Sequence, residues 1–228
     1  MKLAMSGTYS TGKTTTTLAL SYLVGIPRTH AKTMREILPK ALPGKKLEET
    51  TGPELLQLGL RRLLERSIAE SRLDNFISDG SSLHEWVYGM VRSEIGLHPG
   101  SDENINYQHL DELKQYMLNF GAVAKDHAIK SYDEFIHLPI EFPLKKDGHR
   151  PVSEEFRSMS DNLLLTTLDE LKIPYHIVGG SIVDRLNKIV QIYDFEMKMS
   201  IDEAIVKAEQ DVEQFQFEIE KTFYKKEG

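Results

Sequence analysis

The chain has 228 residues, of which 40% are hydrophobic and 28% charged, values typical of a globular protein with a buried core. Its net charge of −7 gives no general basic surface for DNA or RNA, and the absence of cysteine excludes disulfides, thiolate zinc sites and cysteine nucleophiles. No apolar run approaches the roughly 20 residues that span a bilayer, and the first residues lack a signal-peptide pattern. We therefore expect a cytoplasmic protein that binds neither membranes nor nucleic acids.

Short apolar runs alternate with longer helical patterns along the chain. A strand over residues 2–6 leads into helices over 13–24, 33–42 and 53–73. A strand over 74–80 precedes helices over 82–94 and 107–132, the second with Gly121 as a candidate interruption. Then come a strand over 133–140, a helix over 153–173, a strand over 174–180, and helices over 181–195 and 200–226. This order predicts an α/β fold with a doubly wound, mostly parallel sheet, helices on both faces and an added C-terminal helix.

Residues 7–14, "GTYSTGKT", match the phosphate-loop (P-loop) pattern G-x-x-x-x-G-K-[ST] without a mismatch, between the first strand and the first helix. Glycines let the backbone turn so that successive N–H groups point at an anion, and the helix directs its positive end to the same place. We expect Lys13 to reach the β- and γ-phosphates and the Thr14 hydroxyl to bind Mg²⁺. The predicted nucleotide-binding residues of this loop are Gly7, Thr8, Tyr9, Ser10, Thr11, Gly12, Lys13, Thr14 and Thr15.

The segment "FISDGSSLHEWVYG" contributes a second group of candidates. P-loop proteins commonly complete the magnesium shell with an acidic residue at the end of a neighbouring strand, and Asp79 has that position; its alternative role is to cap the next helix. Trp86 and Tyr88 follow near the carboxyl end of the strand, where open α/β sheets bind ligands, although Trp86 suits core packing equally well. His84 has no histidine partner at metal-ligand spacing, so no zinc site is predicted.

Residues 141–157, "EFPLKKDGHRPVSEEFR", have the composition of a lid. Basic side chains on a closing loop can offset the charge that develops during phosphoryl transfer, and Arg150 and Arg157 are the best candidates, with Lys145 and Lys146 as alternatives. The competing interpretation is a solvated charged loop. After the last strand, Gly180 allows a flat ring such as adenine to approach the backbone, or belongs to an ordinary strand-to-helix turn.

Together, "GTYSTGKT", "MREIL", "FISDG" with "HEWVYG", the segment 133–157, "IPYHIVGG" and "SIVDRL" resemble the AAA-domain kinases related to the nicotinamide riboside kinase domain of NadR-type proteins, over roughly residues 1–193. The resemblance implies an ATP- and Mg²⁺-dependent small-molecule kinase with an arginine-bearing lid, with Arg35 near the acceptor. It gives a kinase-like domain over 1–199 and a helical extension over 200–228.

Two positions differ from the family pattern where the acceptor would bind. Lys32 stands three residues before Arg35 in place of a common glutamate, and Asp79 is followed by Gly80 in place of arginine. The sequence therefore predicts phosphoryl transfer to a small hydroxyl-bearing metabolite, of nucleoside or nicotinamide-riboside type, and leaves its identity open. Asp79 either orders the metal's waters or accepts the acceptor's proton. The alternative function is a nucleotide-dependent switch or hydrolase acting on a protein partner. The C-terminal helix either packs on the domain or pairs with another copy.

Overall fold

A computed structural model of the chain describes residues 1–99, 107–144 and 153–224. Its described strands form one parallel five-stranded sheet in the order β2-β3-β1-β4-β5. The strands are β1 (Lys2–Ser6), β2 (Arg28–His30), β3 (Phe76–Asp79), β4 (Glu134–His137) and β5 (Tyr175–Ile177). The α-helices are α1 (Lys13–Val24), α2 (Met34–Ala41), α3 (Gly52–Glu70), α4 (Ser82–Ile95), α5 (Tyr107–Ser131), α6 (Glu154–Leu171), α7 (Ile182–Tyr193) and α8 (Ile201–Tyr224), and a 3₁₀ turn spans Leu47–Glu49.

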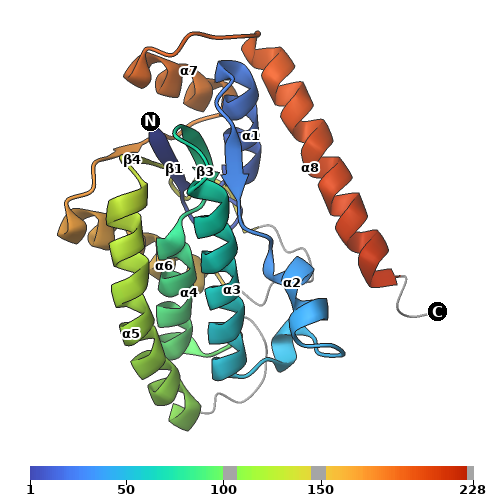
Figure 1. Ribbon diagram of the computed structural model, residues 1–228, viewed down its shortest axis with the longest axis vertical. Helices are drawn as coiled ribbons and strands as arrows, with labels where there is room; N and C mark the ends of the chain where they lie inside the picture. Colours follow the sequence, from blue (N-terminus) through green and yellow to red (C-terminus); the bar gives the residue numbers. More distant parts are fainter. Residues whose placement is uncertain (100–106, 145–152, 225–228) are drawn as a thin grey trace.

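Helices cover both faces of the sheet (Figure 1). On one face Leu3 and Met5 of β1 pack into a core with α1, α7 and α8, whereas Ala4 points to a second core formed with α3, α4, α5 and α6. Burial on both faces of the sheet explains why the central strands β1, β3 and β4 are short, largely apolar runs without polar alternation. The predicted α/β fold with helices on both faces is confirmed.

Helices α4 and α5 lie side by side because small residues let them approach closely (Figure 1). A Cβ on Gly121 would lie 2.5 Å from the indole nitrogen of Trp86, so this position has room only for glycine. The expected interruption at Gly121 is wrong, since α5 runs unbroken from Tyr107 to Ser131. The glycine is there for packing and does not end the helix.

The C-terminal helix α8 packs along α1, as Figure 1 shows. Ala204 and Ala208 are fully buried against this side of the domain, and the Tyr22 hydroxyl donates a hydrogen bond to Asp211. This contact matches the first of the two roles considered for the helix, and pairing with another copy stays a prediction. None of the helices in the described part of the chain has the length and apolar character needed to cross a lipid bilayer.

The strand order places the P-loop at the centre of the sheet. The chain adds β2 and β3 on one side of β1 and then β4 and β5 on the other, so the connection after β1 and the connection after its neighbour β4 leave in opposite directions. Open α/β sheets bind ligands at such a switch point. Residues following β1 and β3 therefore meet at one edge.

Candidate functional site

The loop between β1 and α1 has the backbone of a phosphate cradle. Gly7 has a φ of 130°, and a Cβ there would lie 2.6 Å from the Leu138 carbonyl oxygen, so only glycine fits. Gly12, with a φ of 80°, is the N-cap of α1, and Ser10 between them is also left-handed. The Thr11 hydroxyl donates to the Thr8 carbonyl oxygen at 3.0 Å. Lys13 is the first residue of α1, so the positive end of this helix lies at the loop, and the binding of phosphate by the loop amides stays a prediction.

Asp79 ends β3 directly beside this loop. Its buried carboxylate accepts a hydrogen bond from Thr14 and interacts with the charge of Lys13. Burial raises the pKa of Asp79, but the charges of Arg28 and Lys13 outweigh that effect and hold it at about 2. Ser81, and not Asp79, is the N-cap of the following helix. The structure thus brings Lys13 and Thr14, two of the predicted catalytic and metal-binding residues, to the ionised carboxylate of a third, Asp79.

Arg28 was not predicted from the sequence. Its Nη2 lies 2.7 Å from Asp79 Oδ2, and its side chain is 18% exposed. Arg28 reaches Asp79 because β2 pairs with β3 in parallel, with His30 opposite Asp79. No local pattern marked this position, because Arg28, Thr29 and His30 are all polar.

Arg66 of α3 fixes the end of β3. This fully buried guanidinium donates to the Ser78 hydroxyl at 2.7 Å and to the Asp79 carbonyl oxygen at 3.2 Å. Glu70 lies 3.6 Å from the same guanidinium. These two hydrogen bonds from a buried guanidinium hold the Asp79 backbone in one place.

His84 of α4 supports the P-loop. Its Nδ1 accepts from the Ser81 amide at 3.0 Å, so its Nε2 carries the proton and donates to the Gly7 carbonyl oxygen at 3.2 Å. Burial, followed by the nearby charge of Lys13, lowers the pKa of His84 well below its ordinary value. His84 is therefore neutral at pH 7 and fixes the first glycine of the loop.

Arg185 of α7 joins the P-loop to the lid base. Its guanidinium donates to the Thr11 carbonyl oxygen at 2.5 Å and to the Glu141 carboxylate at 2.9 Å. Glu141 also accepts from the Gly180 amide at 2.8 Å, and the hydrogen bonds from Arg185 and Gly180 lower the Glu141 pKa. The Gly180 amide thus holds the lid base in this structure, and its contact with adenine stays a prediction. The sequence "SIVDRL" contains Arg185 but gave no reason to assign it a role.

Arg157 is placed at the root of the lid. It is fully buried, donates to Glu154 at 2.9 and 3.0 Å and to the Phe142 carbonyl oxygen at 3.0 Å. These contacts tie the start of α6 to Phe142, near the beginning of the predicted lid, and the action of Arg157 on phosphate stays a prediction. Arg150, like Lys145 and Lys146, lies outside the described residues.

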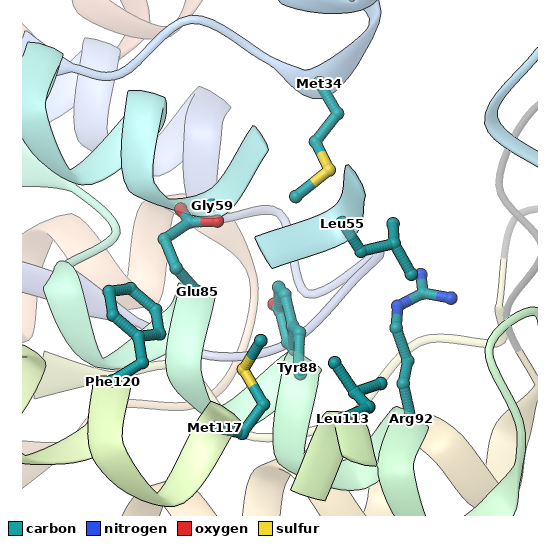
Figure 2. A pocket seen from close by; sticks show the side chains of 10 residues that line it. Met34, Leu55, Gly59, Glu85, Tyr88, Arg92, Leu113, Met117 and Phe120 are labelled. Atoms are coloured by element: carbon teal, nitrogen blue, oxygen red, sulfur yellow. The ribbon is translucent and has the colours of Figure 1, made fainter. Parts of the chain in front are cut away.

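A pocket opens between α2, α3, α4 and α5, beside the P-loop (Figure 2). The cavity itself holds about 20 Å³ for a water-sized sphere, and the wider space between its walls, which includes open solvent at the mouth, is about 350 Å³. Tyr88 stands in the middle, with Glu85 and Arg92 on either side of it. The lining residues are Met34, Leu55, Gly59, Glu85, Tyr88, Gly89, Arg92, Leu113, Met117 and Phe120.

Aromatic contacts connect this pocket to the P-loop. The ring of Tyr9 stacks on Tyr88 with centroids 4.9 Å apart and an angle of 19° between the planes. Phe156 of α6 packs against both rings, at 6.0 Å from Tyr9 and 5.5 Å from Tyr88. The pocket, the P-loop and α6 therefore meet at one aromatic cluster.

The three residues predicted to bind the acceptor have different positions. Tyr88 lines the pocket, as expected for a substrate contact. Trp86 does not: it is 5% exposed, packs in the core under α5 and has Lys125 4.5 Å above its ring. On a helix, residues 85, 88, 89 and 92 share one face, and position 86 points elsewhere. Arg35 follows Met34 on α2, and its side chain lies outside the described residues.

Comparisons with known proteins agree with this architecture. Deoxyadenosine kinase from M. mycoides with bound dATP is similar with a TM-score of 0.59 and 16% identity, over 85% of this chain and 100% of that chain. The NadR protein in complex with NR is similar with a TM-score of 0.57 and 16% identity, over 86% of this chain and 52% of that chain. No curated protein matches the chain by sequence.

The AAA-domain family profile matches residues 2–185, from β1 to the Arg185 that contacts the P-loop. The NadR protein is among the similar structures, so the resemblance drawn from the sequence is confirmed. The match includes every strand of the sheet and both halves of the candidate site, and the chain belongs to the AAA-domain family of P-loop proteins.

Proposed function

We propose that the protein transfers the γ-phosphoryl group of ATP, with Mg²⁺, to a hydroxyl of a small metabolite of the nucleoside class. The observation that carries this proposal is the stacking of Tyr9 on Tyr88, at 4.9 Å, which puts a small-molecule pocket next to a P-loop. A donor site for phosphate and a pocket for an acceptor, in contact, are the two parts that a kinase needs. The similarity to deoxyadenosine kinase and to the NadR protein supports the nucleoside class.

The residues at the carboxyl end of β1 and β3 suit ATP with Mg²⁺. Lys13 and the loop amides would hold the β- and γ-phosphates. Mg²⁺ prefers hard oxygen ligands and keeps several waters, and the contacting Thr14 hydroxyl and ionised Asp79 carboxylate supply such oxygens. When bound, the ion would neutralise charge on the transferred phosphoryl group.

The contacts of Asp79 favour the metal-side role over that of general base. Its carboxylate is engaged by Thr14 and by Arg28, and the low pKa makes it a weak proton acceptor. Arg28 would keep this carboxylate aligned. Arg157, fixed to Glu154 and to the Phe142 carbonyl oxygen, would set the start of the lid.

The switch or hydrolase alternative has less support. A flat surface in place of the acceptor pocket would have favoured it, whereas the described residues form a pocket with two aromatic and two charged side chains. The described part of α8 turns Ala204 and Ala208 into the domain, which leaves fewer apolar positions for a partner.

Transfer of label from [γ-³²P]ATP in the presence of Mg²⁺ to a panel of nucleosides and vitamins tests the proposal. We expect a phosphorylated product with at least one nucleoside. Lys13→Ala should lower the rate by about 10²-fold or more while the melting temperature stays near wild type, because the contact acts on transition-state charge. Lys130→Ala is the matched control, since Lys130 is exposed on α5 and pairs with Asp126. Wild-type transfer by the Lys13→Ala variant would refute the assignment.

A further inference from the structure

Glu85 is a buried carboxylate in the wall of the pocket. The residue is 5% exposed, and neither of its carboxylate oxygens has a hydrogen-bond partner among the described residues. The nearest charge is Arg62, whose Nε lies 3.2 Å from Glu85 Oε1 as an ion pair without hydrogen-bond geometry. Buried carboxylates in proteins are normally hydrogen-bonded, so donors for these two oxygens are expected from something that enters the pocket.

We propose that Glu85 binds two neighbouring hydroxyl groups of the acceptor, so that the pocket selects a molecule with a cis-diol, such as the ribose of a ribonucleoside. The inference rests on the proposed function in taking the pocket as the acceptor site. An ionised carboxylate only accepts hydrogen bonds, and its two adjacent oxygens match two adjacent O–H donors.

The remaining walls suit the flat ring of such a molecule. Leu113, Met117 and Phe120 of α5 form an apolar side, and Met34 closes the opposite end (Figure 2). Tyr88 offers a ring between them. Small-molecule pockets are typically apolar with a few polar groups that fix orientation, and here Glu85 is the polar group on one side of Tyr88.

An ammonium group is the other donor that a buried carboxylate could take. Arg92 lines the same pocket from the other side of Tyr88, and Arg62 already lies beside Glu85. Two guanidinium groups repel a further cation, whereas they do not disfavour neutral hydroxyls. The charges around the pocket therefore favour a neutral ligand over a cationic one.

Removing one hydroxyl from the ligand would leave one oxygen of Glu85 without a donor. A hydrogen bond to a charged group contributes enough that its loss weakens binding about 10- to 100-fold. A site built to bind a hydroxyl rejects the analogue that lacks it, because the buried polar group is then unpaired.

The test uses matched pairs of nucleosides: adenosine, guanosine, cytidine and uridine, each with its 2′-deoxy counterpart. Their affinities for the full-length protein are measured by isothermal titration calorimetry, and phosphorylation from ATP is measured in parallel. We expect at least one ribonucleoside to bind tenfold or more tightly than its 2′-deoxy form. In Glu85→Gln this preference should collapse towards equality, mainly through weaker binding of the ribonucleoside.

Glu94→Gln is the control, since Glu94 is on the same helix but exposed and paired with Lys114. Glu85→Asp, which keeps the charge but withdraws it, provides a second variant if Glu85→Gln fails to fold, and it should also reduce the preference. An unchanged preference in a folded Glu85 variant, a wild-type preference for 2′-deoxynucleosides, or no nucleoside binding at all would overturn the inference. Ribose-selective binding without phosphorylation would instead leave the role of Glu85 intact and refute the kinase proposal.

Discussion

His84 should make the protein lose stability in mild acid. In the folded state its neutral ring bridges the Ser81 amide and the Gly7 carbonyl oxygen, and burial keeps its pKa well below 6.5. An unfolded chain has no such constraint and takes up the proton near pH 6.5. Because the unfolded state binds more protons below that pH, stability is fully present above 6.5 and is lost as the pH falls towards the folded-state pKa.

One proton of difference changes the free energy of unfolding by about 1.4 kcal/mol per pH unit. Between pH 7.5 and 5.5, His84 alone should therefore remove about 1.4 kcal/mol, since the unfolded state goes from mostly neutral to mostly protonated over this interval. His30 and His127, whose pKa values burial also lowers, add losses of the same sign. The contribution of His84 thus has to be isolated by comparison with a variant.

Urea unfolding followed by circular dichroism at pH 7.5, 6.5 and 5.5 measures this effect in the wild type and in His84→Gln. The glutamine keeps a donor for the Gly7 carbonyl oxygen but does not titrate. The free energy of unfolding of this variant should therefore fall less than that of the wild type as the pH is lowered, by the contribution of one proton. His109→Gln, an exposed position on α5, should follow the wild type. Equal pH slopes in the wild type and His84→Gln would show that the ring is not held neutral and that its proposed support of the P-loop is wrong.

Two further variants test the packing and the lid root. Gly121→Ala should lower the free energy of unfolding by about 1–3 kcal/mol and shift the emission of Trp86, because the new methyl group would lie 2.5 Å from the indole nitrogen; Ala122→Gly on the same helix is the comparison, and an unchanged spectrum would contradict the packing. Arg157→Met should lower stability by about 1–3 kcal/mol, since it removes the bonds to Glu154 and to the Phe142 carbonyl oxygen. Loss of phosphoryl transfer at unchanged stability would instead favour the catalytic role that the sequence suggested.

Local patterns were enough to predict most of the fold. The apolar strands flanked by glycine or acidic residues and the strongly periodic helices follow from side-chain burial on both faces of the sheet. The strand β2 was missed, because Arg28, Thr29 and His30 have no apolar pattern and only Thr29 is buried. It becomes a strand through its pairing with β3, a contact between distant segments that no local window contains.

In the candidate site, too, local patterns predicted some residues, and tertiary contacts placed the others. The P-loop could be predicted because its backbone requires glycine and lysine at fixed spacing, and Asp79 because it ends a strand. The partners that tune these residues, Arg28 and Arg185, come from other elements and are placed by tertiary contacts. Trp86 was taken for a ligand contact because it is an aromatic residue near a strand end, yet its helical phase turns it towards Gly121.

Helical phase also explains why the pocket wall contacts the P-loop. His84 and Glu85 are neighbours on α4, and the turn of the helix directs the first to Gly7 and the second into the pocket. One turn later Tyr88 stacks on Tyr9. The helix therefore contacts the loop at two points, through His84 and through Tyr88, and Glu85 between them forms part of the pocket wall. A ligand that moves Tyr88 or Glu85 would therefore act on the same helix that fixes the first glycine of the phosphate cradle. Acceptor binding and phosphate binding are for this reason expected to be coupled, and a nucleoside should change the affinity for ATP in the wild type more than in His84→Gln.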